Sequence, residues 1–137
     1  EDGEMIVNYT DFKVTVDASG VKESSYAEGK GIMVRGEAPQ YDSSLQPVND
    51  YSYLWAYSHS SQTIDKMIVS LVGYRDNGYR IGTDRQESPD GWQVGALSAY
   101  VKPLDLGLDY KVGKGESYHF YRCKGYQDYD CELTWEK

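Results

Sequence analysis

The sequence predicts an all-β protein, an antiparallel two-sheet β-sandwich of eight to nine strands. Apolar and polar residues alternate with a period of two in several segments, which is the pattern of half-buried strands. Clusters of Gly, Pro, Asn and Asp separate these segments at short intervals, and no segment of the sequence has a helical period. A closed up-and-down β-barrel would show the same pattern and stays the alternative. The 137 residues fit a single domain over 1–137.

The N-terminal third contains two predicted strands. Residues 11–17 alternate between apolar and charged or polar side chains and predict a half-buried strand. Residues 30–37 predict a second strand with Ile32 and Val34 pointing inward. The polar segment 21–29 between them predicts no element of its own.

The segment 38–50 is predicted to be irregular. It contains Pro39 and Pro47 together with serines and aspartates, which favour turns over strands. We expect a flexible connection between the two sheets, although long loops are also places where binding residues gather.

The strand predicted at 51–58 has one aromatic face and one small, apolar face. The aromatic face consists of Tyr51, Tyr53, Trp55 and Tyr57. The favoured interpretation buries this face, with Trp55 at the centre of the sandwich, because contiguous exposed aromatic patches are rare on monomers. In the alternative, Leu54 and Ala56 face the core and the aromatic residues form an exposed platform of the kind that stacks on sugars.

The next segments predict a central hairpin. Residues 64–75 are apolar on both faces, which is typical of a strand with neighbours on both sides. A two-residue turn would place Arg75 opposite Arg80, and like charges directly opposite each other are unfavourable. A three-residue loop with Gly78 in the left-handed conformation pairs Arg75 with Tyr79 and Tyr74 with Arg80 instead. A further strand is predicted at 92–102, and clean alternation at 104–112 predicts one strand or two short strands bent at Gly107.

The C-terminal segment contains the two cysteines of the chain, Cys123 and Cys131. We expect a disulfide between them that closes a hairpin of strands 118–123 and 131–136, although two free buried cysteines are the alternative. The bond would fix the register: Cys123 opposite Cys131, Tyr121 opposite Leu133, and His119 opposite Trp135. Disulfides form in oxidising compartments, so this bond predicts a secreted or extracellular protein, as does an acidic start without a leader.

Charge and composition restrict the function classes. A net charge of -8 and a pI near 4.7 argue against binding to nucleic acid or to an anionic membrane surface. No apolar run reaches the ~18 residues of a membrane span, so we expect no membrane insertion. The sequence leaves the oligomeric state open.

Residues for catalysis are sparse in the sequence, which predicts a non-enzyme without cofactor or metal. The only histidines are His59 and His119, and His119 is expected to have a structural role within its strand. Asp105 and Asp109 would lie about 13 Å apart on one strand face, which is too far for a glycosidase pair. A solvated acidic tip is the favoured interpretation of Asp128, Asp130 and Glu132.

The remaining hypothesis is a binding surface. Tyr126 and Tyr129 lie at the tip of the predicted hairpin, where a pinned loop would bind at a low entropic cost. Trp92, after the loop 88–91, and Tyr51 are further candidates. The sequence therefore predicts a non-catalytic secreted or cell-surface binding module for a carbohydrate or protein ligand. The alternative is a small exported effector, a toxin or inhibitor, that acts through one protein partner.

Overall fold

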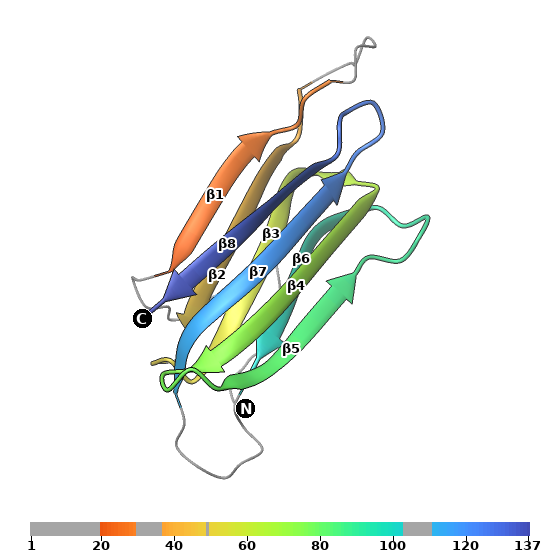
Figure 1. Cartoon of the computed structure of the whole chain (residues 1–137). Helices are drawn as coiled ribbons and strands as arrows, with labels where there is room; N and C mark the ends of the chain where they lie inside the picture. Colours follow the sequence, from red (N-terminus) through yellow and green to blue (C-terminus); the bar gives the residue numbers. More distant parts are fainter. Residues whose placement is uncertain (1–19, 30–36, 49, 103–110) are drawn as a thin grey trace.

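The computed structural model describes residues 20–29, 37–48, 50–102 and 111–137, and these form a β-sandwich. Two antiparallel four-stranded sheets stack face to face, in the orders β1-β2-β3-β6 and β5-β4-β7-β8 (Figure 1). The strands are β1 (Val21–Tyr26), β2 (Gln40–Val48), β3 (Tyr53–Ile64), β4 (Lys66–Arg75), β5 (Arg80–Glu87), β6 (Val94–Val101), β7 (Val112–Arg122) and β8 (Tyr129–Glu136). The predicted fold class is confirmed, and the sheets do not close into a barrel.

The edges of the two sheets are joined by side chains rather than by a strand ladder. On one side, the backbone N–H of Tyr100 in β6 donates to Asp84 in β5 at 3.0 Å. On the other side, the Tyr129 hydroxyl of β8 donates to Glu23 of β1 at 2.5 Å. Figure 1 shows these pairs of edge strands lying next to each other. Hydrogen bonds therefore connect the two sheets at both edges, although no described strand of one sheet pairs with a strand of the other.

One half of the inter-sheet core is apolar. It contains Leu45, Leu54, Ala56, Val69, Leu71 and Trp135, which we call the apolar half. Two glycines let the sheets approach closely here. A Cβ on Gly73 would lie 2.8 Å from Val101 Cγ1, and one on Gly115 would lie 2.8 Å from Leu54 Cδ1. A larger residue at either position would force the contacted Val101 or Leu54 side chain to shift.

The other half of the core is polar. It contains Ser43, Ser58, Ser117, His119 and Tyr121, all buried, which we call the polar half. The His119 ring bridges the sheets, with Nδ1 2.7 Å from Ser58 Oγ and Nε2 2.8 Å from Ser117 Oγ. Tyr121 donates to the backbone carbonyl of Asp42 at 2.9 Å and lies 2.7 Å from Ser43 Oγ. Each of these five side chains thus has a polar partner, whereas the buried hydroxyl of the neighbouring Tyr41 has no hydrogen bond among the described residues.

Two segments that the sequence left without a strand form two of the four strands of one sheet. The polar segment 21–29 contains β1, and the segment predicted to be irregular contains β2, so that prediction was wrong. Ser43 is buried in the strand and lies 2.7 Å from the Tyr121 hydroxyl across the core, whereas the buried Ser44 accepts from Gln46 Nε2 within β2 at 3.4 Å. Pro47 is tolerated because it lies beyond the residues of β2 that pair with β1.

Each interpretation of the aromatic face of β3 was wrong in one part. Leu54 and Ala56 face the other sheet, so Trp55 is not at the centre of the sandwich. Yet Tyr53 and Trp55, on the outer side, are only 6% and 4% exposed and form no open platform. Trp55 donates from Nε1 to Ser98 Oγ at 3.0 Å, and its ring packs with the half-buried Tyr57. Both faces of this strand are therefore buried.

The predicted central hairpin is confirmed. β4 lies between β5 and β7, the Arg75 N–H donates to the Tyr79 carbonyl at 2.8 Å, and Tyr74 pairs with Arg80. Gly78 has a φ of 91°, the left-handed conformation that the three-residue loop requires. The strand predicted at 92–102 is present as β6. The strands predicted at 11–17, 30–37 and 104–112 fall almost wholly outside the described residues.

The predicted disulfide and the hairpin register were wrong. Cys123 and Cys131 are both free thiols. His119 pairs with Cys131, Tyr121 with Tyr129, and Gly115 with Trp135. Cys123 lies beyond the end of β7, in a turn where the Tyr126 N–H donates to the Cys123 carbonyl at 3.0 Å and Gly125 has a φ of 92°. Because Cys123 belongs to this turn, it does not pair with Cys131 as the predicted register required.

Candidate binding surfaces

The tip of the β7–β8 hairpin, predicted as a contact loop, packs against the chain after β1. Tyr126 is 7% exposed and forms an isolated antiparallel bridge with Gly29. The Gln127 N–H donates to the Glu28 carbonyl at 2.6 Å. Burial leaves the Tyr126 ring little surface to offer a ligand, whereas it adds apolar contact with Ala27 and Tyr41.

Tyr129 belongs to a stack of three tyrosines at the same end. Its ring centroid lies 5.9 Å from that of Tyr41, which stacks on Tyr121 at 4.3 Å with an interplanar angle of 9°. Burial raises the pKa of Tyr121 to about 12, and burial also raises the pKa of Tyr41 and of Tyr129 above the ordinary value. The three phenols are therefore neutral at physiological pH, which suits a packed stack rather than a nucleophile.

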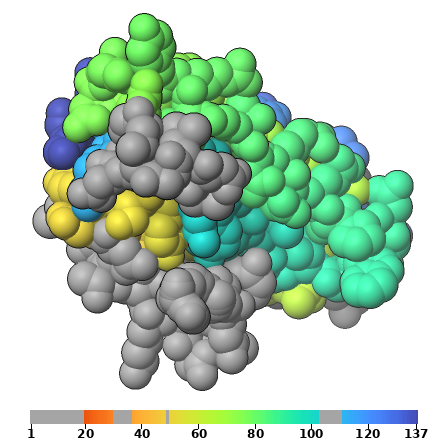
Figure 2. Space-filling view, turned by 90° about the horizontal axis from the view of Figure 1, so that it is seen from below, coloured from red at the N-terminus to blue at the C-terminus, as the bar shows by residue number. Residues whose placement is uncertain are grey.

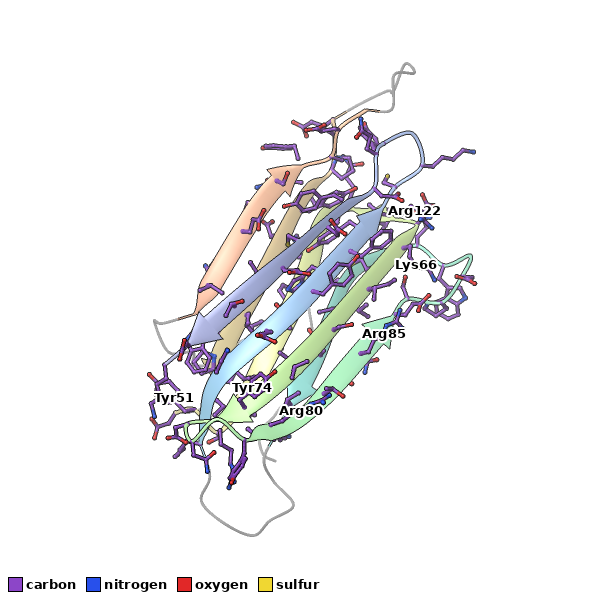
Figure 3. The ribbon with its side chains drawn as sticks, viewed as in Figure 1. Tyr51, Lys66, Tyr74, Arg80, Arg85 and Arg122 are labelled. Carbon is purple, nitrogen blue, oxygen red and sulfur yellow. The ribbon has the colours of Figure 1, made fainter. Side chains whose placement is uncertain are left out.

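Tyr51 lies at the other end of the sandwich and covers the edge of the apolar half. Its ring stacks on Trp135 at 6.0 Å, and Lys137 Nζ lies 4.3 Å from the ring centroid. The backbone φ is 65°, an uncommon conformation for a residue other than glycine. Figure 2 views this end of the sandwich, where Figure 3 labels Tyr51, Tyr74 and Arg80. The ring thus already has contacts within the fold, with Trp135 and with Lys137.

Trp92 is the predicted site residue that the structure leaves open, with 67% of its surface exposed. It ends a turn in which its N–H donates to the Pro89 carbonyl at 3.2 Å and Gly91 has a φ of 82°. Ser88 ties the turn to β4: the Met67 N–H donates to Ser88 Oγ, and the Ser88 N–H donates to the Met67 carbonyl, both at 3.0 Å. The indole is therefore presented on an anchored turn.

The anchor includes a partly buried cation. The side chain of Lys66 is 13% exposed, and its Nζ lies 2.5 Å from Asp90 and 3.0 Å from Glu87. Hydrogen bonds from Lys66 lower the pKa of both carboxyls, and those same bonds raise the pKa of Lys66. Figure 3 shows Lys66 at the same end of the sandwich as Arg122. We call residues 88–93 with Lys66 the Trp92 turn.

Asp65 extends this polar surrounding. It accepts from Gln93 Nε2 at 2.8 Å and from the Lys124 N–H at 2.6 Å. The Trp92 turn and the β7–β8 hairpin tip are thus tied to one carboxylate. An exposed indole here has carboxylate and amide groups as neighbours, which is the mixture found where sugars or polar protein surfaces bind.

A second surface, which the sequence did not suggest, lies on the outer face of the sheet β5-β4-β7-β8. It is a hollow of about 290 Å³ with a floor at Ser117 and Leu133. Its walls are side chains of β4, β7 and β8: Ser70, Val72, Glu116, Tyr118, Glu132 and Thr134. These residues come from three separate segments, and the incorrect hairpin register paired Arg122 with Glu132, whereas the structure pairs Tyr118 with Glu132. We call this the β7 hollow.

The histidines are placed differently from each other. Burial lowers the pKa of His119 to about 4, so its ring is neutral and enclosed between two serines. His59 lies 3.7 Å from Asp42, with both side chains 44% exposed. Within the described ranges, no three His, Cys, Asp or Glu side chains are grouped to hold a metal ion. Those ranges also contain no helix with the length and apolar content needed to cross a bilayer.

Comparison of this chain with known protein families, curated proteins and solved structures gave no match.

Proposed function

We propose that this protein is a non-catalytic binding module for a carbohydrate, with Trp92 as its central contact residue. The observation that supports this most directly is the exposed indole on the anchored Trp92 turn. Exposing a large aromatic side chain has no folding benefit, and aromatic rings on pre-ordered turns are typical of contact surfaces.

The chemistry around the indole suits a sugar. A pyranose ring offers a C–H face that packs on an aromatic ring, while its hydroxyls need acceptors and donors at the rim. Asp90 and Gln93 flank Trp92 in the chain and supply both kinds of group. Because Ser88 and Lys66 already hold the turn, little conformational entropy is lost when a ligand binds.

The alternative is a small exported effector that acts through one protein partner. An exposed tryptophan favours this function as well, because tryptophan is enriched among residues that dominate protein interfaces. A secreted or cell-surface location remains a prediction for both functions, and the free thiols remove the disulfide from its support.

A glycan array with the full chain and two variants tests the proposal. Trp92→Ala is expected to weaken saccharide binding at least about tenfold, as for a dominant contact residue. Tyr79→Ala is the matched control, because Tyr79 is 66% exposed and lies on the β4–β5 turn at the other end of the sheet. Equal binding by Trp92→Ala and the parent chain would contradict the proposal. An array without any bound glycan would also refute it and leave the protein-partner function.

A further inference from the structure

We propose that the β7 hollow binds a primary ammonium group on an alkyl chain, as carried by a lysine side chain or a free alkylamine. This site is separate from the Trp92 turn and does not depend on the carbohydrate function. The argument rests on the order of side chains along β7 and on the partners that each of them has.

The outer face of β7 carries a row of alternating charges and rings. In order along the strand it consists of Lys114, Glu116, Tyr118, Phe120 and Arg122. Each end of this row already has a cation over an aromatic ring. Arg122 Cζ lies 5.2 Å from the Phe120 centroid, and Lys114 Nζ lies 5.5 Å from the centroid of Tyr74, its cross-strand partner. Figure 3 shows Arg122 and Tyr74 toward opposite ends of the sheet.

The hollow lies between these two cation–ring pairs. Tyr118 forms one wall, half-buried, with its hydroxyl directed to Asp130 at 3.0 Å. Among the described residues no cation lies over the Tyr118 ring, in contrast to Phe120 and Tyr74 at either end. The face of an aromatic ring attracts a cation through its quadrupole, and most strongly where water is partly excluded.

The carboxylates of the hollow favour the same kind of ligand. Glu132 lies directly across from Tyr118 and has no ion pair among the side chains that the structure describes. Glu116 is only 3.8 Å from Lys114 and accepts a long hydrogen bond of 3.4 Å from Tyr74. The one arginine opposite Ser70, Arg85, is already paired with Glu87 at 3.0 Å. The hollow is therefore left with a negative charge that a ligand cation would neutralise.

The remaining walls define the rest of the ligand. Val72 is apolar and half-buried, and Ser70 and Thr134 supply hydroxyl groups. A volume of about 290 Å³ holds one flexible side chain rather than a large ligand. An alkylammonium group fits this space, with its chain against Val72 and the Tyr118 ring and its charge toward Glu132.

The test uses three probes in nuclear magnetic resonance titrations of the full chain at low salt. They are N-acetyl-lysine methylamide, its neutral norleucine analogue, and butylammonium. The two ammonium probes are expected to bind with a Kd of about 1–10 mM and to shift the amide signals around Tyr118 and Glu132, whereas the norleucine probe should not. Tighter binding of the lysine probe assigns a peptide source, and equal binding of butylammonium assigns a small amine.

Four variants separate this site from general attraction to an acidic protein. Glu132→Gln and Tyr118→Leu should each weaken ammonium binding by about threefold or more. Tyr118→Phe should retain it, because the ring remains. Glu136→Gln is the matched control, since Glu136 is also exposed on β8 but lies outside the hollow. The proposal is overturned if no ammonium probe binds, if the norleucine probe binds equally well, or if Glu136→Gln weakens binding as much as Glu132→Gln.

Discussion

The two halves of the inter-sheet core are built from different chemistry. In the apolar half, Leu54 and Trp135 pack among other buried apolar side chains, and Gly73 and Gly115 leave room for this packing. In the polar half, His119 and Tyr121 span the same gap through hydrogen bonds to Ser58 and Ser43. The stability of the apolar half depends on how well its side chains fit together, whereas the stability of the polar half depends on particular hydrogen-bond partners and on their protonation.

This difference predicts different responses to perturbation. Burying an apolar side chain contributes roughly 25 cal/mol per Å² without regard to pH, and its loss is felt as a cavity. A buried hydrogen bond contributes only about 1 kcal/mol, but an unpaired partner costs more than the bond had gained. The following changes test whether the two halves behave in these two ways.

The largest effect is expected from Trp135→Ala in the apolar half. Trp135 is 1% exposed, and its removal should lower the free energy of unfolding by about 4 kcal/mol, through lost transfer energy and a cavity. Urea-induced unfolding measures the change. Trp92→Ala is the control, because its exposed indole should contribute less than about 0.5 kcal/mol. Equal effects of the two variants would contradict the position of Trp135 in the core.

Acid is expected to destabilise the polar half. Burial lowers the pKa of His119 from 6.5 to about 4, so the unfolded chain binds a proton between these values when the folded chain does not. Stability is therefore fully present above pH 6.5 and is lost as the pH falls toward 4. A shift of this size corresponds to about 3 kcal/mol.

Unfolding curves at pH 7 and pH 4 for the parent chain and for His119→Gln measure the contribution of His119 to the pH dependence of stability. Carboxylates also contribute to acid unfolding, so the informative quantity is the difference between the two proteins. The parent chain should lose more stability than the variant over this interval. A His119→Gln variant with the same pH dependence as the parent would refute the assignment.

A smaller effect is expected when one partner of the ring is removed. Ser58→Ala leaves Nδ1 of the buried His119 without its partner 2.7 Å away, and this should cost about 2 kcal/mol. Ser24→Ala is an exposed serine control on edge strand β1, where we expect a change below about 0.5 kcal/mol. Thermal unfolding of both variants makes the comparison, and a Ser58→Ala effect as small as the control would mean that water replaces the serine.

The same contrast explains how far the sequence could predict the fold. The β4–β5 turn was predictable because Asp76-Asn77-Gly78 and the two flanking arginines determine it locally. β2 was not, because Ser43 finds its buried partner, Tyr121, only 78 residues later in the sequence. In the same way, Ser58 of β3 meets His119 across 61 residues. A serine on the inward face of a strand looks like a loop residue until the other sheet is known.

The two candidate binding surfaces also differ in how far the sequence could predict them. Trp92 was predictable as a candidate because turn residues 88–91 and an aromatic residue are adjacent in the sequence. The β7 hollow combines residues of β4, β7 and β8, and it could be found only with the correct register of β7 and β8. That register was missed because the cysteines suggested a pairing, whereas the Cys123–Tyr126 turn sets the strand ends.

The smallest effect is expected at Cys123, at the margin of the polar half. A disulfide would have contributed roughly 2–3 kcal/mol by closing the hairpin, whereas a free, half-buried thiol contributes mainly local packing. Cys123→Ala should therefore change the free energy of unfolding by less than about 1 kcal/mol. Cys131→Ala should cost more, because the Cys131 thiol donates to Ser43 Oγ at 3.4 Å and belongs to the polar network. Alkylation without reductant should label both thiols in the mass spectrum. If both variants and the reduced parent instead lost the same free energy of unfolding, roughly 2–3 kcal/mol, a disulfide between Cys123 and Cys131 would close the polar half.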